Sequence, residues 1–437
     1  MRDVWDAARL EALDKNHSWH PFTQMQAWCD PSHDPVILVD GEGAILRDSR
    51  GREYIDGNSS IWTNLHGHRH PLITAAIKDQ LDRVAHVSFL GSSNAPATEL
   101  ASRLVDLLPG GRLNRVFFSD DGSTAIEVAI KMAAQFWQLT GQPDRKGFIA
   151  FDNAYHGDTA GAASLGGIST FTRRFEGHHF PVTRITSPED LENIPAFRNR
   201  RIAAVVIEPL VQGAAGIRLW PPGLLRDLRA RCDETGTLLI LDEVLTGFGR
   251  TGTMFACQQE NVIPDFLCLA KGLTGGYMPL AATLTTESVF SAFLGRFDEL
   301  KTFFYGHSYT ANPLGCAAAL ANLDVFKTEN VPADLAKKIP LLTSLLESLK
   351  TNPHVHEIRQ CGFISGIEIR HPDGTPFPWT ERTGARVCEA ARRHGLLTRP
   401  ILDTIVLMPP FCITAGQLES AVSAIAKALG ETLRSPH

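Results

Sequence analysis

Short apolar runs alternate with stretches of helical periodicity between about residue 100 and residue 320. Apolar runs bounded by turn signals are typical of strands that a parallel sheet buries on both faces. Such runs occupy residues 115–118, 148–151, 202–207, 238–241 and 266–270. A helix with one apolar face is predicted from Thr124 to about Gln138. The alternation predicts an α/β fold with a mostly parallel central sheet and helices on both of its faces.

The pattern changes on either side of this region. Short strands separated by turns are predicted near residues 36–39 and 44–46, where the chain offers little core of its own. After residue 329, helices are predicted near 335–350, 380–394 and 415–433, and strands near 356–369. We therefore expect an N-terminal segment at 1–60 that packs with the small domain, a large domain at 61–328, and a smaller α+β C-terminal domain at 329–437.

Two of the apolar runs end in an ionisable residue, Asp242 after one and Lys271 after the other. In open α/β sheets, ligands bind at the carboxyl ends of the strands. Pyridoxal phosphate is held there as a Schiff base on a lysine, and its ring nitrogen takes a carboxylate partner. The glycines after Lys271 let the backbone approach a bulky cofactor. The pair predicts a pyridoxal phosphate site, and the alternative is that Asp242 caps the next element while Lys271 is a solvated lysine.

The turn at Gly122 and Ser123 joins a strand to a helix. A glycine turn before a helix N-terminus is a ready anion site, since backbone N–H groups there point outward. Thr124 and Glu127 also have the spacing of a capping box. The turn is therefore either a phosphate cradle or a plain helix cap.

Two further residues follow strands at the same predicted edge. Tyr155 comes shortly after the run 148–151, where an aromatic ring could stack on a flat cofactor or belong to the core. Glu208 ends the run 202–207 and adds a third acid to the edge. Both positions agree with a ligand site at the carboxyl ends of the strands.

Three histidines, His66, His68 and His70, lie within five residues. A helical zinc motif would need the two histidines on one helix face, and this stretch contains glycine and is followed by Pro71. We expect a loop whose imidazoles bond backbone groups or a partner chain, and no metal site.

Composition narrows the function classes. The chain of 437 residues is 43% hydrophobic and 21% charged, as in soluble globular proteins. A net charge of −6 with scattered cations gives no reason to expect nucleic acid or an acidic membrane surface as partner. No apolar segment reaches the roughly 18 residues of a membrane helix, and the first residues lack the apolar core of a signal peptide. Eight dispersed cysteines indicate reduced thiols in a cytoplasmic protein.

The motifs of the commonest rival α/β enzymes are missing. The sequence has no G-x-x-x-x-G-K-[ST] nucleotide loop, no G-x-G-x-x-G fingerprint between a strand and a helix, and no G-x-S-x-G elbow.

The chain resembles the class III pyridoxal-phosphate aminotransferases of fold type I, on the residues LDEVLTGFGRTG at 241–252 and AKGL at 270–273. The likeness spans nearly the whole chain. Within that family, biotin-pathway members are matched by WHPFTQM at 19–25, IEPLVQG at 207–213, TGG at 274–276 and LMPP at 407–410. The resemblance implies amino transfer to 8-amino-7-oxononanoate, with S-adenosylmethionine or lysine as the amino donor.

The resemblance also implies roles for single residues. Lys271 would carry the Schiff base, Asp242 would pair with the ring nitrogen, and Tyr155 would stack on the cofactor and touch substrate. The remaining cofactor-binding residues would be Asp121, Gly122 and Ser123 in the phosphate loop, with His307 and Ser308 in a loop lent by the second subunit of a homodimer. The substrate-binding residues would be Phe22, Ile61, Trp62, Asp158, Gly306 and Arg399, the last of these on the substrate carboxylate.

The sequence departs from the family's S-adenosylmethionine users at three places. Those members commonly have Tyr at Phe22, Trp-Trp at Ile61 and Trp62, and Gly-Pro-Thr at residues 306–308. The stretch YGHSYT at 305–310 is more similar to lysine-using members. Two alternatives stay open: another class III ω-aminotransferase or aminomutase, and a catalytically silent binding or scaffold protein, against which intact Lys271 and Asp242 argue.

Overall fold

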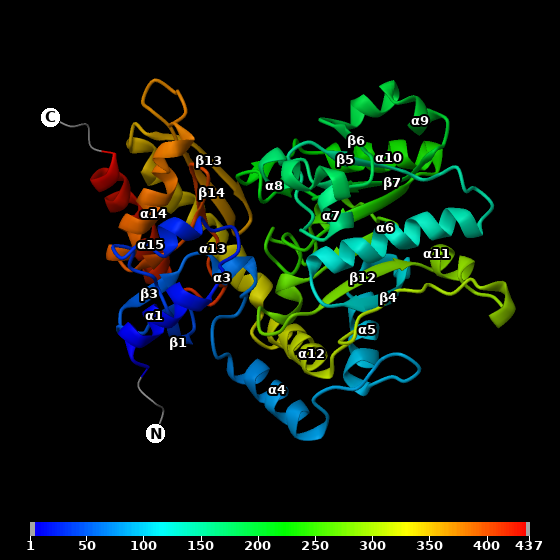
Figure 1. Cartoon of the computed structure of the whole chain (residues 1–437), viewed down its shortest axis with the longest axis horizontal. Coiled ribbons are helices and arrows are strands. Elements are labelled where there is room, and N and C mark those ends of the chain that lie inside the picture. The colour runs from blue at the N-terminus through cyan, green and yellow to red at the C-terminus, as the bar shows by residue number, and fades with distance from the viewer. Residues whose placement is uncertain (1–4, 434–437) are drawn as a thin grey trace.

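The computed structural model describes residues 5–433, so the extreme ends of the predicted terminal ranges, and part of the stretch judged for a signal peptide, lie outside it. The larger lobe is built on a seven-stranded sheet (Figure 1). Its strands are, in spatial order, β4 (Leu113–Ser119), β12 (Ala281–Thr286), β11 (Phe266–Leu269), β10 (Leu238–Asp242), β7 (Ile202–Ile207), β5 (Gly147–Phe151) and β6 (Val182–Ile185). Strand β12 is antiparallel to both neighbours, and the other pairs are parallel. The predicted α/β fold with a mostly parallel sheet is confirmed.

The central strands are buried on both faces. Every residue of β7 and β10 is buried. Alternate side chains enter two different apolar clusters: Val205 and Leu241 belong to one, and Val206 and Ile240 to the other. Helix α6 (Gly122–Leu139) contributes to the second cluster, while α5 (Ala95–Asp106), α10 (Leu224–Thr235) and α12 (Pro313–Thr328) contribute to the first. Helices therefore cover both faces, which explains the continuous apolar runs in the sequence.

A second lobe combines the two ends of the chain, blue and orange-red in Figure 1. One of its sheets joins β1 (Leu38–Glu42), β2 (Ile45–Asp48) and β3 (Glu53–Asp56) to β15 (Leu396–Leu397), so the N-terminal segment pairs directly with the C-terminal region. The other sheet has the order β13 (Val355–Cys361), β14 (Ile364–Ile369), β17 (Thr404–Leu407) and β16 (Pro400–Ile401). The small pair β8 (Val211–Gln212) and β9 (Arg218–Leu219) lies apart.

The remaining α-helices are α1 (Ala7–His17), α2 (Met25–Trp28), α3 (Ser59–Trp62), α4 (Pro71–Arg83), α7 (Ala160–Leu165), α8 (Ser169–Thr172), α9 (Pro195–Arg198), α11 (Glu287–Ala292), α13 (Val331–Glu347), α14 (Thr383–Arg393) and α15 (Ala415–Thr432). Within residues 5–433, none of the helices is long and apolar enough to cross a membrane.

Two of the three clustered histidines pair with carboxylates and the third enters the core, whereas bonds to backbone groups or to a partner chain were expected. His68 Nε2 lies 3.0 Å from Asp56 Oδ2, and His70 Nε2 lies 2.9 Å from Glu329 Oε1. His66 is buried with its ring against Phe326, and burial lowers its pKa to about 3. Backbone bonds were the wrong expectation for His68 and His70, because their carboxylate partners come from other parts of the chain. Bonds to a partner chain stay a prediction. No group of three metal-ligating side chains is present in the described part of the chain.

Candidate active site

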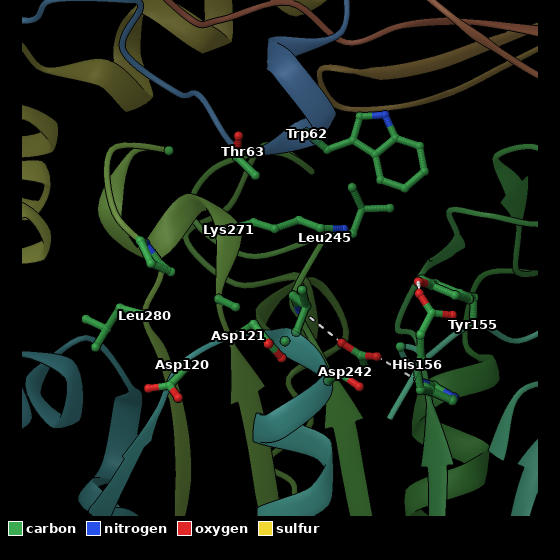
Figure 2. A pocket seen from close by; sticks show the side chains of 18 of the residues that line it. Trp62, Thr63, Asp120, Asp121, Tyr155, His156, Asp242, Leu245, Lys271 and Leu280 are labelled. Atoms are coloured by element: carbon green, nitrogen blue, oxygen red, sulfur yellow. Dashed lines mark hydrogen bonds and ion pairs between the residues drawn. The ribbon is translucent and has the colours of Figure 1, made fainter. Parts of the chain in front are cut away.

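The carboxyl ends of β4, β5, β7, β10 and β11 meet at one edge of the large sheet, above which lies a cavity of about 710 Å³. Figure 2 shows the side chains that enter it from these strand ends, with Trp62 facing them from the opposite wall. The sequence-predicted residues that line the cavity are Trp62, Asp121, Gly122, Ser123, Tyr155, Asp158, Asp242 and Lys271. Most of the predicted site residues therefore lie together at the carboxyl edge of the sheet.

Lys271 begins η5 (Lys271–Thr274), the short turn that follows β11. Its backbone has a φ of 45°, in the left-handed region that residues with a side chain rarely adopt. The side chain extends across the cavity, and its Nζ lies 4.8 Å from the ring centroid of Trp62 (Figure 2). Burial lowers the pKa of Lys271 below its ordinary value of 10.5, although the charges of Asp242 and Glu208 oppose the shift. A lysine in this environment loses its proton more readily than a surface lysine.

Asp242 ends β10 and is held in place by a buried histidine that the sequence analysis did not select. Its Oδ2 lies 2.7 Å from His156 Nδ1, and its Oδ1 accepts from the backbone N–H of Val244 at 3.1 Å. Burial acts to lower the pKa of His156, but the hydrogen bond and charge of Asp242 outweigh it and leave the pKa raised. His156 therefore acts on Asp242 from within the protein, and the two form an ion pair when the imidazole is protonated.

Tyr155 lines the cavity, and its hydroxyl is hydrogen-bonded to Asp158, another predicted residue. The hydroxyl donates to Asp158 Oδ2 at 2.7 Å, and the backbone N–H donates to Glu208 Oε1 at 3.1 Å. The ring meets Phe171 edge to face at 5.9 Å between centroids. Burial and the neighbouring Asp158 raise the pKa of Tyr155, so its hydroxyl stays protonated at neutral pH.

Glu208 is the third acid of the edge, and it too faces the cavity. Its carboxylate accepts from the backbone N–H groups of Tyr155 and Gly213, at 3.1 and 2.9 Å. Burial is the main cause that raises the pKa of Glu208 to about 7. The charge of Asp242 adds to this rise, and that of His156 opposes it. Glu208 thus changes charge near neutral pH while it holds the backbone of Tyr155 in place.

The first turn of α6 lies at the cavity where an anion site was predicted, and its cap differs from the expected one. Asp121 is the N-cap, and its Oδ1 accepts from the N–H of Thr124, whose hydroxyl bonds back to the start of the turn. Glu127, expected to complete a capping box with Thr124, accepts instead from the N–H of Gly161 at 2.7 Å. The expectation failed because the helix begins one residue after Asp121, so Thr124 is already its third residue.

Gly122 packs closely against the loop after β10, and Ser123 is tied to Thr159. A Cβ placed on Gly122 would lie 2.6 Å from Val244 Cγ1, so only glycine fits between these elements. Ser123 Oγ accepts from the N–H of Thr159 at 3.0 Å and bonds its hydroxyl at 2.7 Å. The N–H groups of a first helical turn lack partners within the helix, which suits them to a phosphate.

Several predicted residues lie away from this cavity in the single chain. His307 Nδ1 is 2.7 Å from the chain's own Asp120 Oδ2, and the carbonyl of Ser308 accepts from His86, while Gly306 precedes them. None of the residues 306–308 lines the cavity. Arg399 is exposed and also absent from the lining.

The remaining two predicted substrate residues lie near the site's outer side. Phe22 is exposed and lines an adjoining cavity of about 430 Å³, which shares Tyr155, Gly157 and Asp158 with the first. Its ring meets Phe171 at 5.3 Å between centroids. Ile61 is exposed beside Trp62 and lines neither cavity.

The cavity residues fit pyridoxal phosphate. Lys271 offers an amine of lowered pKa, Asp242 offers a carboxylate fixed by His156, and the first turn of α6 offers N–H groups for a phosphate. The left-handed backbone at Lys271 and the close packing at Gly122 are features of the kind that cluster at ligand sites. This fold and this site together define a pyridoxal-phosphate-dependent enzyme of fold type I.

Comparison with known proteins gives the family. The family model for aminotransferase class III matches residues 28–429, and the chain belongs to that family. The adenosylmethionine-8-amino-7-oxononanoate aminotransferase of Geobacter sulfurreducens is 46% identical, with 97% of this chain and 98% of the relative covered. An aminotransferase acts on a small-molecule amino donor and a keto acceptor, so the chain is an enzyme of this class.

Solved structures agree with this family. The adenosylmethionine-8-amino-7-oxononanoate aminotransferase of Methanocaldococcus jannaschii superposes with a TM-score of 0.95 at 40% identity, covering 98% of this chain and 100% of that one. An (S)-enantioselective ω-transaminase from Thermomicrobium roseum superposes with a TM-score of 0.93 at 34% identity, covering 98% and 100%.

Proposed function

We propose that this enzyme converts 8-amino-7-oxononanoate to 7,8-diaminononanoate, a step of biotin biosynthesis. The observation that carries the proposal is the near-complete match to relatives named for this reaction, the first of them 46% identical over 97% of the chain. The chain keeps a lysine and an aspartate at the carboxyl edge of the sheet, as a transaminase needs. A silent binding protein would have no use for a buried lysine of lowered pKa beside a fixed carboxylate.

Each residue of the edge has a part in the proposed reaction. Pyridoxal phosphate, when bound, supplies an electron sink that accepts charge as a bond to the substrate α-carbon breaks. Asp242, positioned by His156, would hold a proton on the ring nitrogen. The N–H groups of Gly122 and Ser123 would hold the phosphate, and Tyr155, whose hydroxyl is fixed by Asp158, would flank the ring.

Lys271 has two successive parts. Its amine would hold the cofactor in the resting enzyme and would be free once the amino donor is bound. The free Nζ would then take the proton from the donor's α-carbon as general base and deliver it to the cofactor as general acid, for which its lowered pKa suits it. The enclosing Trp62 excludes water from this proton transfer. The same residues act in reverse order on the keto acid.

The experiment that tests the function offers the purified enzyme 8-amino-7-oxononanoate with each donor separately and detects 7,8-diaminononanoate by mass. A second candidate, an ω-transaminase for simple amines, is favoured by the similarity to the Thermomicrobium roseum enzyme. Simple amines with pyruvate are therefore the matched control. Product only from the simple amines would replace the biotin-pathway function with the second candidate.

We infer that the working enzyme is a homodimer in which each subunit lends residues 306–308 to its partner's site. In the single chain, Leu90, Phe304 and Tyr309 are highly exposed apolar side chains. Their two loops lie together, because the ring of His86 packs against that of Tyr309 at 4.6 Å between centroids and its Nε2 bonds the carbonyl of Ser308. Exposed apolar groups gathered in this way are typical of a protein interface.

Subunit mixing tests this arrangement directly. Lys271→Ala and Ser308→Asp chains are each expected to be inactive, the second because an added negative charge opposes the phosphate. If Ser308 serves the partner's site, a mixed dimer contains one site with both residues intact, and activity returns. If Ser308 serves its own site, every site in the mixture is defective, and activity stays absent. Light scattering gives the oligomer mass in the same samples.

We also infer that the enzyme works in the cytoplasm. All eight cysteines lie in the described residues, and all are free thiols. A reducing compartment is where such thiols persist. Cell fractionation with an antibody to the protein checks this location.

A further inference from the structure

One buried side chain of α12 holds the turn that carries Lys271, from the side away from the cavity. Asn322 is completely buried. Its Nδ2 donates to the carbonyl oxygens of Gly272 at 3.0 Å and Leu273 at 3.1 Å. An amide nitrogen has two N–H donors, and here both are used on consecutive carbonyls. Asn322 therefore ties the two residues directly after Lys271 to a helix of the core.

The backbone of this turn needs such a support. Lys271 has a φ of 45° and Gly275, just after the turn, has a φ of 62°, so both lie in the left-handed region. A non-glycine residue stays in that region only where its surroundings fix it. A Cβ on Gly275 would lie 2.9 Å from Asn322 Oδ1, which shows how closely the amide fills the space beside the turn. The same side chain thus supplies both the hydrogen bonds and the packing.

Stability alone does not explain an amide at this position. Among residues 5–433, Asn322 Oδ1 has no partner with hydrogen-bond geometry. The buried imidazole of His66 is nevertheless near enough for Asn322 to act on its pKa. A buried acceptor without a good partner costs folding free energy, and a leucine, which has the same branching but is larger and apolar, would avoid that cost. What Asn322 adds over leucine is the pair of donors to the turn.

We propose that Asn322 is a positioning residue for Lys271, and that its two hydrogen bonds fix the left-handed backbone from which the lysine amine reaches the cavity. The proposal rests on the proposed role of Lys271 as the lysine that bonds the cofactor. The amine must reach both the cofactor and the substrate α-carbon from one backbone position. A displacement of about 1 Å in such a group costs on the order of 100-fold in rate.

The test compares Asn322→Leu, which removes both donors, with Asn322→Ser, which keeps one. Val325→Ala is the matched control, since it truncates another completely buried residue of α12 that makes no side-chain hydrogen bond to the turn. Pyridoxal phosphate is added to each cofactor-free protein. Borohydride reduction at timed intervals then traps the lysine-bound fraction, and peptide mass spectrometry measures it at residue 271. Thermal unfolding and the steady-state constants are measured alongside.

We expect Asn322→Leu to unfold at a temperature no lower than Val325→Ala does, while its bond to the cofactor forms about tenfold or more slowly. Its kcat should fall by a similar factor with KM for the keto acid within about twofold, and Asn322→Ser should lie between. A folded Asn322→Leu protein that bonds the cofactor at the wild-type rate would overturn the proposal. So would an equal slowing in Val325→Ala at equal thermal stability. Cofactor trapped on a lysine other than residue 271 would instead overturn the proposed function.

Discussion

His156 Nδ1 lies 2.7 Å from Asp242 Oδ2 in the interior of the protein, although His156 lies in the loop after β5, Asp242 ends β10, and β7 separates these two strands. Both side chains are buried, so water competes little for either. A buried carboxylate needs hydrogen-bonding partners to replace the water it has lost. His156 and the backbone N–H of Val244 supply these partners, and the carboxylate remains available to the ring nitrogen of the cofactor.

Asp242→Asn should therefore leave the fold intact and lower the rate of the first half-reaction on the order of 100-fold or more. The amide keeps the shape of the side chain but cannot hold a proton on the ring nitrogen by charge. Stopped-flow absorbance with the amino donor alone measures this step, and circular dichroism serves as the control for folding. An unchanged half-reaction rate would remove Asp242 from the proposed role.

Lys271→Ala should abolish turnover and leave pyridoxal phosphate held without a covalent bond. The variant would lose the cofactor on gel filtration, whereas wild type keeps it. Lys78→Ala, which changes an exposed lysine of α4, is the control and should behave as wild type. Ordinary turnover by purified Lys271→Ala would contradict the assignment of this lysine.

Glu208 should make the cofactor-free protein less stable as the pH rises. Its pKa is raised from 4.5 to about 7 by burial, so the folded state holds the proton more tightly than the unfolded chain. The contribution of Glu208 to stability is then fully present below about pH 4.5 and is lost as the pH rises through about 7. Glu208→Gln cannot ionise and escapes this loss.

The stability of Glu208→Gln relative to wild type should improve by roughly 2–4 kcal/mol between pH 4.5 and pH 8. Glutamine has one acceptor oxygen for the two N–H groups of Tyr155 and Gly213, so a constant penalty applies at every pH. Urea unfolding at the two pH values separates the constant penalty from the pH-dependent part. A difference that does not change with pH would show that Glu208 keeps an ordinary pKa.

The sequence predicted Lys271 and Asp242 because one topological rule, that parallel strands present their carboxyl ends at one edge, applies to single apolar runs. It missed His156 because that side chain is defined by its contact with Asp242 across an intervening strand. It also missed β12, whose inward Thr283 and Thr285 interrupt the apolar pattern. Their hydroxyls donate to the carbonyls of Ala125 and Asp265, so they are satisfied inside the core.

The domain ranges and single-residue roles stay predictions for a similar reason. Residues 306–308 lie against their own chain here, and their proposed work depends on a second subunit. Arg399 is exposed, and its proposed place in the site depends on an ion pair with a bound substrate carboxylate. Contacts with a ligand or a partner subunit do not produce a hydrophobic periodicity in the sequence, so pattern analysis of one chain does not detect them.

The last prediction is that lysine serves as amino donor with a higher kcat/KM than S-adenosylmethionine. A sulfonium donor that carries an adenosine gains from aromatic faces, each worth roughly 0.5–2 kcal/mol toward a cation. Trp62 has its face against Lys271 Nζ, Phe22 lacks a hydroxyl to orient the donor, and Ile61 has no π face. The adjoining cavity does hold further rings, including Phe171, so the comparison must be measured with both donors at saturating keto acid.

Ile61→Trp should then raise kcat/KM for S-adenosylmethionine and leave that for lysine nearly unchanged. A clear preference of the wild type for S-adenosylmethionine would contradict the donor assignment, and it would leave the keto acceptor and the roles of Lys271 and Asp242 as they are.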